Sequence, residues 1–334
     1  MKKLAYWGFS LTLVSALAMP MFAQQAQKQI HDPKEYDAYA KGCYAEKDLA
    51  TQAANCEKFL ADYPKSVMLT DAYLQTVVSY HQAGNWAKTI AWVDKQPAGL
   101  AELTPDQKTL LLQSGLRSAQ QIKNPAKIQT YAEEFLKLDP RNFEALFTLS
   151  GLLYGATIPA DEAAKTKHFD YTLDITKRAL AYPRPAGVKD DQWNPVINQL
   201  HNTVAMVLVN QKKYNEAIAE ADVSIGINKK DGYAYYLKGL AKKPDVLDAI
   251  KKYTESVKKL NDNRTADQIT RDDLKAAKDA LDQVATAKTD ELVQIFATSA
   301  ACGETRARQE LKIFTGTPDE LEKIIQTKKV ELCG

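Results

Sequence analysis

The stretch from His201 to Ser224 decides the fold. It reads HNTVAMVLVNQKKYNEAIAEADVS, and its apolar and small residues recur at intervals of three or four. Such spacing places residues on one face of an α-helix. The first stripe contains His201, Val204, Ala205 and Leu208, and the second contains Ala217, Ala221 and Ser224. The polar segment 211–213 lies between the two stripes. The stretch therefore predicts two closely packed helices joined by a short turn.

The pattern recurs 34 residues later. Tyr235 corresponds to His201, and Gly239 corresponds to the small residue Ala205. Ala249, Tyr253 and Ser256 repeat the second stripe. A 34-residue period of paired helices with these small positions resembles the tetratricopeptide repeat. The resemblance implies an all-α fold, a right-handed α-solenoid of helix-turn-helix repeats.

Weaker copies of the unit precede this stretch. The small positions of the first helices are Ala40, Val77, Gly115, Ser150, Ala205 and Gly239. Four of the five intervals between them lie close to the period, which predicts about six degenerate repeats over residues 24–260, clearest at 198–260. The longest interval contains two insertions, Gly155–Thr166 and Pro183–Pro195. The second, with three prolines, is interpreted either as a hinge or displayed loop or as a rigid connector.

Residues 261–334 depart from the repeat. Helical periodicity continues through Leu274, Leu281 and Phe296, and the Thr317–Glu320 segment has the residues of a further helix start. Solenoids need terminal segments that cover the exposed end of the core. We therefore expect 261–334 to form a C-terminal capping helical segment.

The N-terminus has the layout of a secretory signal peptide. Two lysines precede an uncharged apolar run over residues 4–18, and small residues end at Ala23. The alternative is a membrane anchor, but the run is at or below the roughly 20 residues that a spanning helix needs. We expect residues 1–23 to be removed, which leaves an exported chain, periplasmic or secreted, without a membrane anchor.

Composition excludes some classes of partner. The formal net charge of +2 falls to about zero once Lys2 and Lys3 are removed, so nothing indicates binding to nucleic acid or to an anionic membrane. The chain has only 14 glycines and 13 prolines among 334 residues, which favours long helices with short turns.

The cysteines allow disulfides in an exported protein. None is in a CxxC pair and the four histidines do not cluster with them, so we predict no metal site. In the repeat geometry that the resemblance implies, Cys43 and Cys56 lie on inward faces of one hairpin and form a candidate pair. Cys302 and Cys333 form a second candidate pair that would tie the tail to the last helical unit. Four buried free thiols are the alternative.

The sequence contains no GxSxG, phosphate-binding glycine loop or HExxH. We therefore predict no catalytic residue, no enzymatic activity and no cofactor. His201 stands where the repeat has a large packing residue, which favours a core role for it.

What the resemblance implies is a binding function. In this family the first helix of each hairpin lines a concave groove that takes a peptide. The expected groove residues are Leu74, Val78, Leu112, Leu116, Phe147, Asn202, Met206 and Tyr236. These are mostly apolar, and the Lys/Asn/Arg set that grips acidic C-termini is missing. We expect a non-catalytic adaptor or scaffold of the cell envelope that binds another envelope protein or a peptide segment of it. The alternatives are that neighbouring helices cover the groove, or that the chain carries a small molecule or lipid in a pocket near Pro183–Pro195.

Overall fold

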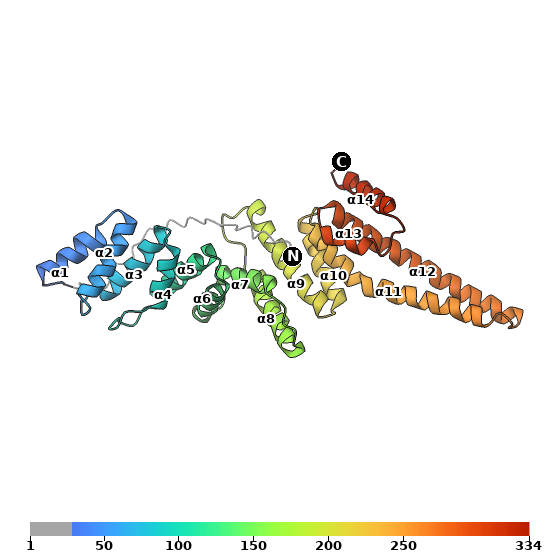
Figure 1. Ribbon diagram of the computed structural model, residues 1–334, viewed down its shortest axis with the longest axis horizontal. Coiled ribbons are helices and arrows are strands. Elements are labelled where there is room, and N and C mark those ends of the chain that lie inside the picture. The colour runs from blue at the N-terminus through green and yellow to red at the C-terminus, as the bar shows by residue number, and fades with distance from the viewer. Residues whose placement is uncertain (1–28, 334) are drawn as a thin grey trace. The chain divides into compact units, whose positions relative to one another are not determined.

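The structure, a computed structural model, describes residues 29–333 (Figure 1). Every regular element in that range is a helix, and the all-α prediction is confirmed. Within the described range, the chain divides into two compact units, the first ending at Ser114 and the second beginning at Gly115. The expected signal peptide lies outside the described residues.

The first unit begins with the helical hairpin that contains Cys43 and Cys56. The Asp32 carboxylate accepts a hydrogen bond from the backbone N–H of Lys34, and Pro33 opens the helix. The helices of this unit are α1 (Pro33–Asp37), the π-helix η1 (Ala38–Tyr44), α2 (Leu49–Asp62), α3 (Leu69–Gln82), α4 (Trp86–Asp94) and the first part of α5 (Pro105–Gln121). The first repeat helix thus widens into a π-helix after one α-helical turn, which its apolar spacing does not reveal.

A disulfide joins η1 to α2. The Cα atoms of Cys43 and Cys56 lie 4.5 Å apart, which confirms this predicted pair. Both cysteines are fully buried and pack with Phe59, Tyr73 and Val77 in one apolar cluster. The cross-link and the apolar contacts therefore stabilise the same part of the unit. Cys302 ends α12, and the side chain of Cys333 lies outside the described atoms, so the second pair stays a prediction.

The second unit continues the alternation of antiparallel helices. Its helices after α5 are α6 (Pro125–Leu138), α7 (Phe143–Gly155), α8 (Glu162–Leu180), α9 (Asp190–Asn210), α10 (Tyr214–Ile227), α11 (Gly232–Asp262), α12 (Gln268–Ala301), α13 (Thr305–Leu311) and α14 (Pro318–Cys333). Consecutive helices pack against each other from α6 to α12. The predicted turn at 211–213 separates α9 from α10, with Lys212 at a positive φ of 61°. The chain is an α-solenoid of helix hairpins, as expected.

The small positions lie where helices approach closely. Val77, Ser150 and Ala205 are buried, and a Cβ at Gly115 would lie 3.1 Å from the Tyr131 ring. A Cβ at Gly239 would overlap the ring of Phe296. Because a larger side chain would separate the helices, these positions explain the period seen in the sequence.

The last predicted hairpin is wrong. Residues 232–262 form the single helix α11, which continues through Pro244, and the expected second helix with Ala249 is the second half of α11. Its antiparallel partner is instead α12, and the two helices run side by side (Figure 1). The sequence between the two stripes has no glycine to begin a turn, and packing against α12 buries Val246 and Ala249 on the continuous helix.

The two insertions are shorter than their sequences indicate. Helix α8 begins at Glu162, inside the Gly155–Thr166 insertion. Helix α9 begins at Asp190 and includes Pro195, so the irregular part of the Pro183–Pro195 insertion ends at Lys189. Pro195 is the sixth residue of α9 and lacks a backbone N–H, so the carbonyl of Asp191 has no intrahelical donor at this position.

Helices α13 and α14 pack against the end of α12. Leu292 and Phe296 of α12 are buried together with Leu311, Leu321 and Ile325. The predicted helix start at Pro318 is confirmed. The C-terminal segment thus shares one apolar cluster with Val246 of α11.

Candidate partner-binding surface

The predicted groove residues are divided between the two units. Leu74, Val78 and Leu112 belong to the first unit, and Leu116, Phe147, Asn202, Met206 and Tyr236 belong to the second. In the second unit, the last four of these come from α7, α9 and α11, the first helices of successive hairpins. Helix α9 contacts both α7 and α11, so these first helices form a continuous row.

Three of the predicted groove residues are buried. Leu74 is 6% exposed, Leu116 is 0% exposed and Asn202 is 7% exposed. Side chains with so little accessible surface cannot contribute a substantial contact area to a partner. The prediction that these residues contact a partner is therefore corrected. Leu74 and Leu116 pack inside the array, because neighbouring helices cover both these residues and the adjacent packing stripe.

Asn202 has a structural role in a polar cluster. Its amide donates to the Asp231 carboxylate over 2.6 Å, and its carbonyl accepts from the Ser224 hydroxyl over 2.9 Å. Asn198 also donates to Asp231. These groups join α9, α10 and the start of α11, and each is satisfied inside the protein. The amide is therefore occupied and does not face a partner.

The remaining predicted residues keep part of their surface. Val78, Leu112, Phe147, Met206 and Tyr236 are half-buried, so part of each side chain is accessible. We call Phe147, Met206 and Tyr236, which lie on three neighbouring helices of one unit, the first-helix row.

Aromatic side chains surround the start of this row. The Phe143 ring lies 5.9 Å from the Phe147 ring and 5.1 Å from the ring of Trp193. Tyr182, in the loop after α8, also lies 5.1 Å from Phe143. Trp193 of α9, near the end of the Pro183–Pro195 insertion, therefore packs on the aromatic residues of α7.

A tyrosine cluster borders the other end of the row. Tyr154 of α7 and Tyr233 of α11 meet edge to face at 6.2 Å, and Tyr233 stacks on Tyr236 at 6.3 Å. Met206 of α9 packs on the same apolar cluster as Tyr233. Burial is the largest cause that raises the pKa of Tyr233 well above its ordinary value, so this phenol stays protonated and neutral.

Arg306 of α13 covers two rings of the tyrosine cluster. Its guanidinium carbon lies 4.8 Å from the ring centre of Tyr233 and 4.8 Å from that of Tyr236. The Glu304 carboxylate accepts two hydrogen bonds from this guanidinium, at 2.8 and 2.7 Å. Burial alone would raise the pKa of Glu304, but the hydrogen bonds from Arg306 outweigh it and lower that pKa. The pair thus carries both charges at neutral pH.

Aromatic and arginine side chains provide large contact areas and are enriched at the residues that dominate binding energies.

Three of the histidines have packing contacts: His81 faces Trp86, His168 faces Phe169, and His201 lies 2.6 Å from Glu220. Within residues 29–333, no group of three His, Cys, Asp or Glu residues could hold a metal ion. Across the same range, no helix has the length and apolar character needed to span a membrane.

Sequence reasoning missed the tyrosine cluster. Tyr233 and Tyr236 are three residues apart on one helix, and that spacing could have shown that they share a face. Arg306 lies some 70 residues further along the chain, and no local pattern indicates its position over these rings.

No model of a known protein family matches the chain, and no curated protein matches it. Among solved structures, the chain is similar to a tetratricopeptide repeat protein from Parabacteroides merdae ATCC 43184. The two are 10% identical with a TM-score of 0.36, and the match covers 88% of this chain and 96% of that chain.

Proposed function

We propose that the chain is a non-catalytic scaffold that binds a segment of another protein along the first-helix row. The observation that carries the proposal is the row itself. Phe147, Met206 and Tyr236 are half-buried apolar side chains on three helices that lie next to one another. A helical array that holds such side chains in fixed positions is suited to binding a partner with little loss of conformational entropy.

The chemistry of the row favours an apolar partner segment. The phenol of Tyr233 stays neutral, and the charges of Arg306 and Glu304 compensate each other at the edge of the tyrosine cluster. An amphipathic helix or a hydrophobic strand would bury its apolar side chains against such a surface. An acidic C-terminus would find no set of cationic side chains on the row.

The cell envelope is the proposed compartment. The Cys43–Cys56 disulfide suits an oxidising environment, where such bonds persist. The apolar run of residues 4–18, with small residues after it, supports export through a signal peptide. The proposed partner is accordingly another envelope protein.

Site-specific photo-crosslinking in the source cells tests the proposal. A photoreactive phenylalanine analogue replaces Met206 or Tyr236, and the cells are irradiated. We expect one discrete adduct with a partner protein from both positions. The partner is then identified by mass spectrometry, purified and titrated against the wild-type chain and a Met206→Glu, Tyr236→Glu variant. The variant is expected to bind at least about tenfold more weakly, since a charge in an apolar contact is costly to desolvate.

Matched controls lie on the second helices. Tyr171 of α8 is 37% exposed and Val223 of α10 is 46% exposed. The analogue at these positions is expected to give no adduct with the same partner, and Val223→Glu is expected to leave its affinity unchanged. Equal adducts from both sets of positions, or equal affinity for the row variant with an unchanged circular dichroism spectrum, would exclude the first-helix row as the binding surface.

A further inference from the structure

The outer half of the α11–α12 hairpin lacks a third helix. Figure 1 shows α11 and α12 side by side there, with no other helix beside them. Residues 250–284, all of which the structure describes, include no fully buried side chain. The large apolar residues between the two helices are half-buried: Ile250, Tyr253, Val257, Leu260, Leu274 and Leu281. Two helices alone therefore do not enclose these side chains.

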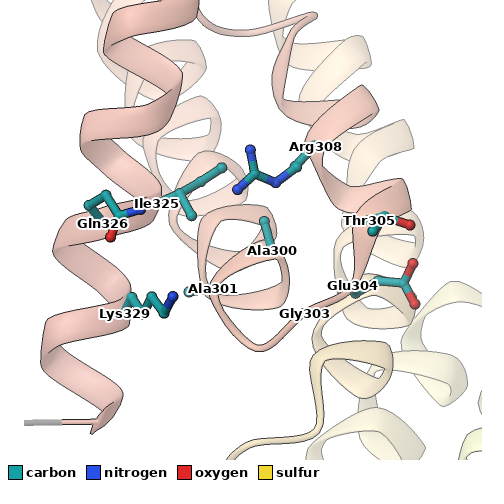
Figure 2. A pocket seen from close by; sticks show the side chains of 9 residues that line it. All are labelled: Ala300, Ala301, Gly303, Glu304, Thr305, Arg308, Ile325, Gln326 and Lys329. Atoms are coloured by element: carbon teal, nitrogen blue, oxygen red, sulfur yellow. The ribbon is translucent and has the colours of Figure 1, made fainter.

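Nearer its base, the hairpin is covered by the C-terminal helices. Figure 2 shows Arg308 of α13 and Ile325 of α14 beside Ala300 of α12. Ala300 and Ile325 are buried there in one apolar cluster. Because helices in proteins are stabilised mainly by packing of their apolar faces, the outer half is the part of the hairpin that a partner would complete.

An ion pair identifies one flank of the hairpin. The Lys288 ammonium of α12 lies 2.6 Å from the Asp245 carboxylate of α11. Lys252 and Lys259 follow Asp245 at intervals of seven residues and therefore share its face of α11. Lys252 is paired with Asp248 at 2.7 Å, and Lys259 is exposed near the tip of the hairpin.

An exposed apolar row lies on the same flank of α12. Asp273, Ala277, Ala280 and Val284 precede Lys288 at successive intervals of three or four residues, so they share its face of the helix. All four are exposed, and Val284 keeps 47% of its surface accessible. The two alanines allow a second helix to approach closely. We call this row, together with the row on α11, the hairpin flank.

The charges at the two ends of the hairpin flank are self-complementary. On α11, Asp245 lies at the base and Lys259 lies near the tip, whereas on α12 the basic Lys288 lies at the base and Asp273 lies near the tip. A second copy in the reversed direction would place its Asp273 opposite Lys288 and its Lys259 opposite Asp245. A two-fold symmetric interface requires a surface that matches itself in this way.

Helix α10 favours the reversed direction. Ala241, one turn before Asp245 on the same face of α11, packs with Ala217 of α10. Helix α10 would therefore block a second hairpin whose tip points the same way. In the reversed direction, the hairpin flank is about 25 Å long and about 20 Å wide, from the rise and diameter of an α-helix. Two such flanks would bury about 1,000 Å² in total, the area from which specific interfaces begin.

We propose that the chain forms a two-fold symmetric dimer through the hairpin flank, in which the α11–α12 hairpins of two copies lie antiparallel as a four-helix bundle. Asp273 of each copy lies against Lys288 of the other, and Val284 lies against Ala277. The hairpin flank is separate from the first-helix row, so the dimer does not depend on the proposed scaffold function. It would give each assembly two such rows.

Sedimentation equilibrium of the full chain tests the dimer. We expect the wild type to be dimeric at micromolar concentrations. Val284→Glu is expected to raise the dissociation constant at least about tenfold, since the interface would then bury an unpaired carboxylate. Thr286→Glu is the matched control, because Thr286 is exposed on the same helix but outside the hairpin flank, and it is expected to leave the dissociation constant unchanged. A monomeric wild type, or equal dissociation constants for the two glutamate variants, would overturn the proposal.

Charge reversal tests the direction of the two hairpins. Asp273→Lys and Lys288→Asp chains are each expected to dimerise several-fold more weakly than the wild type, because each dimer sets like charges against each other twice. An equimolar mixture of the two variants is expected to recover dimerisation, since unlike chains pair opposite charges at both contacts. With both tips pointing the same way, mixing would create no such pair. A mixture that dimerises no better than the separate variants would therefore overturn the antiparallel arrangement.

Discussion

The ring of Phe296 on α12 occupies the space that a side chain at Gly239 on α11 would need. Phe296 is fully buried, and it contacts Tyr236 one turn before the glycine, with their rings 6.2 Å apart. The closest approach of α11 and α12 therefore depends on the absence of a Cβ at position 239.

We expect Gly239→Ala to destabilise the protein. Alanine favours the helix by about 1 kcal/mol, but overpacking against a buried ring costs about 1–3 kcal/mol. The net loss of unfolding free energy is expected to be up to about 2 kcal/mol. Urea denaturation followed by circular dichroism measures it. Gly226→Ala in α10 is the control: no atom lies within 4 Å of a Cβ there, so alanine is expected to stabilise slightly.

The same contact shows how far the sequence predicts the fold. The spacing of small residues identifies Gly239 and Gly115 as positions where two helices approach closely, because a residue without a Cβ atom is visible in the sequence as a glycine. It does not identify the partner helix. The stripe after Gly239 predicts a second short helix packed against it, whereas Phe296 belongs to α12. Helix α11 continues through Pro244, and Val246 and Ala249 beyond the proline are buried.

For the candidate surface, periodicity gives the face of a helix but not how deeply its neighbours cover it. Phe147 and Met206 are half-buried as a groove residue should be, and Leu116 on an equivalent face is fully buried. The difference depends on contacts between helices far apart in sequence. Arg306 on the tyrosine cluster is a contact of the same kind.

Removal of the Cys43–Cys56 disulfide is expected to destabilise the first unit. The bond closes a loop of 13 residues, for which the loss of unfolded-state entropy contributes about 3 kcal/mol. A Cys43→Ala, Cys56→Ala variant should show faster amide hydrogen exchange in η1, α2 and α3, measured by mass spectrometry. Equal exchange in the variant and the wild type would contradict a stabilising role.

Asp231 joins three helices, and Asp231→Ala is expected to cost about 2–4 kcal/mol. One carboxylate oxygen caps α11 by accepting from the backbone N–H groups of Tyr233 and Ala234, and the other accepts from Asn202. The variant loses the cap and leaves the buried Asn202 amide without its acceptor. Thermal unfolding measures the loss. Asp161→Ala, which removes only an exposed cap of α8, is expected to cost about 1 kcal/mol.

Alkaline pH is expected to weaken the first unit through Tyr73. Burial raises the pKa of Tyr73 to about 12, and its hydroxyl donates to the carbonyl of Trp92. The raised pKa means that this stability is fully present below pH 10, where the unfolded phenol ionises, and is lost as pH rises to about 12. The loss amounts to about 2–3 kcal/mol. Tyr73→Phe should flatten the dependence of urea stability on pH in this window. Tyr36→Phe, an exposed tyrosine, should leave it unchanged.

Pro244 lies inside α11, and Pro244→Ala is expected to stabilise the protein. Proline cannot donate to the carbonyl of Leu240 and its ring crowds that carbonyl, at a cost of up to about 3 kcal/mol in a helix interior. Packing on α12 holds the helix together across this position, since Val246 and Leu292 are buried on both sides of the contact. Alanine restores the hydrogen bond and keeps the packing, so the urea midpoint should rise. A lower midpoint would mean that α11 requires the bend that proline imposes to follow α12 and that the alanine helix no longer fits against it.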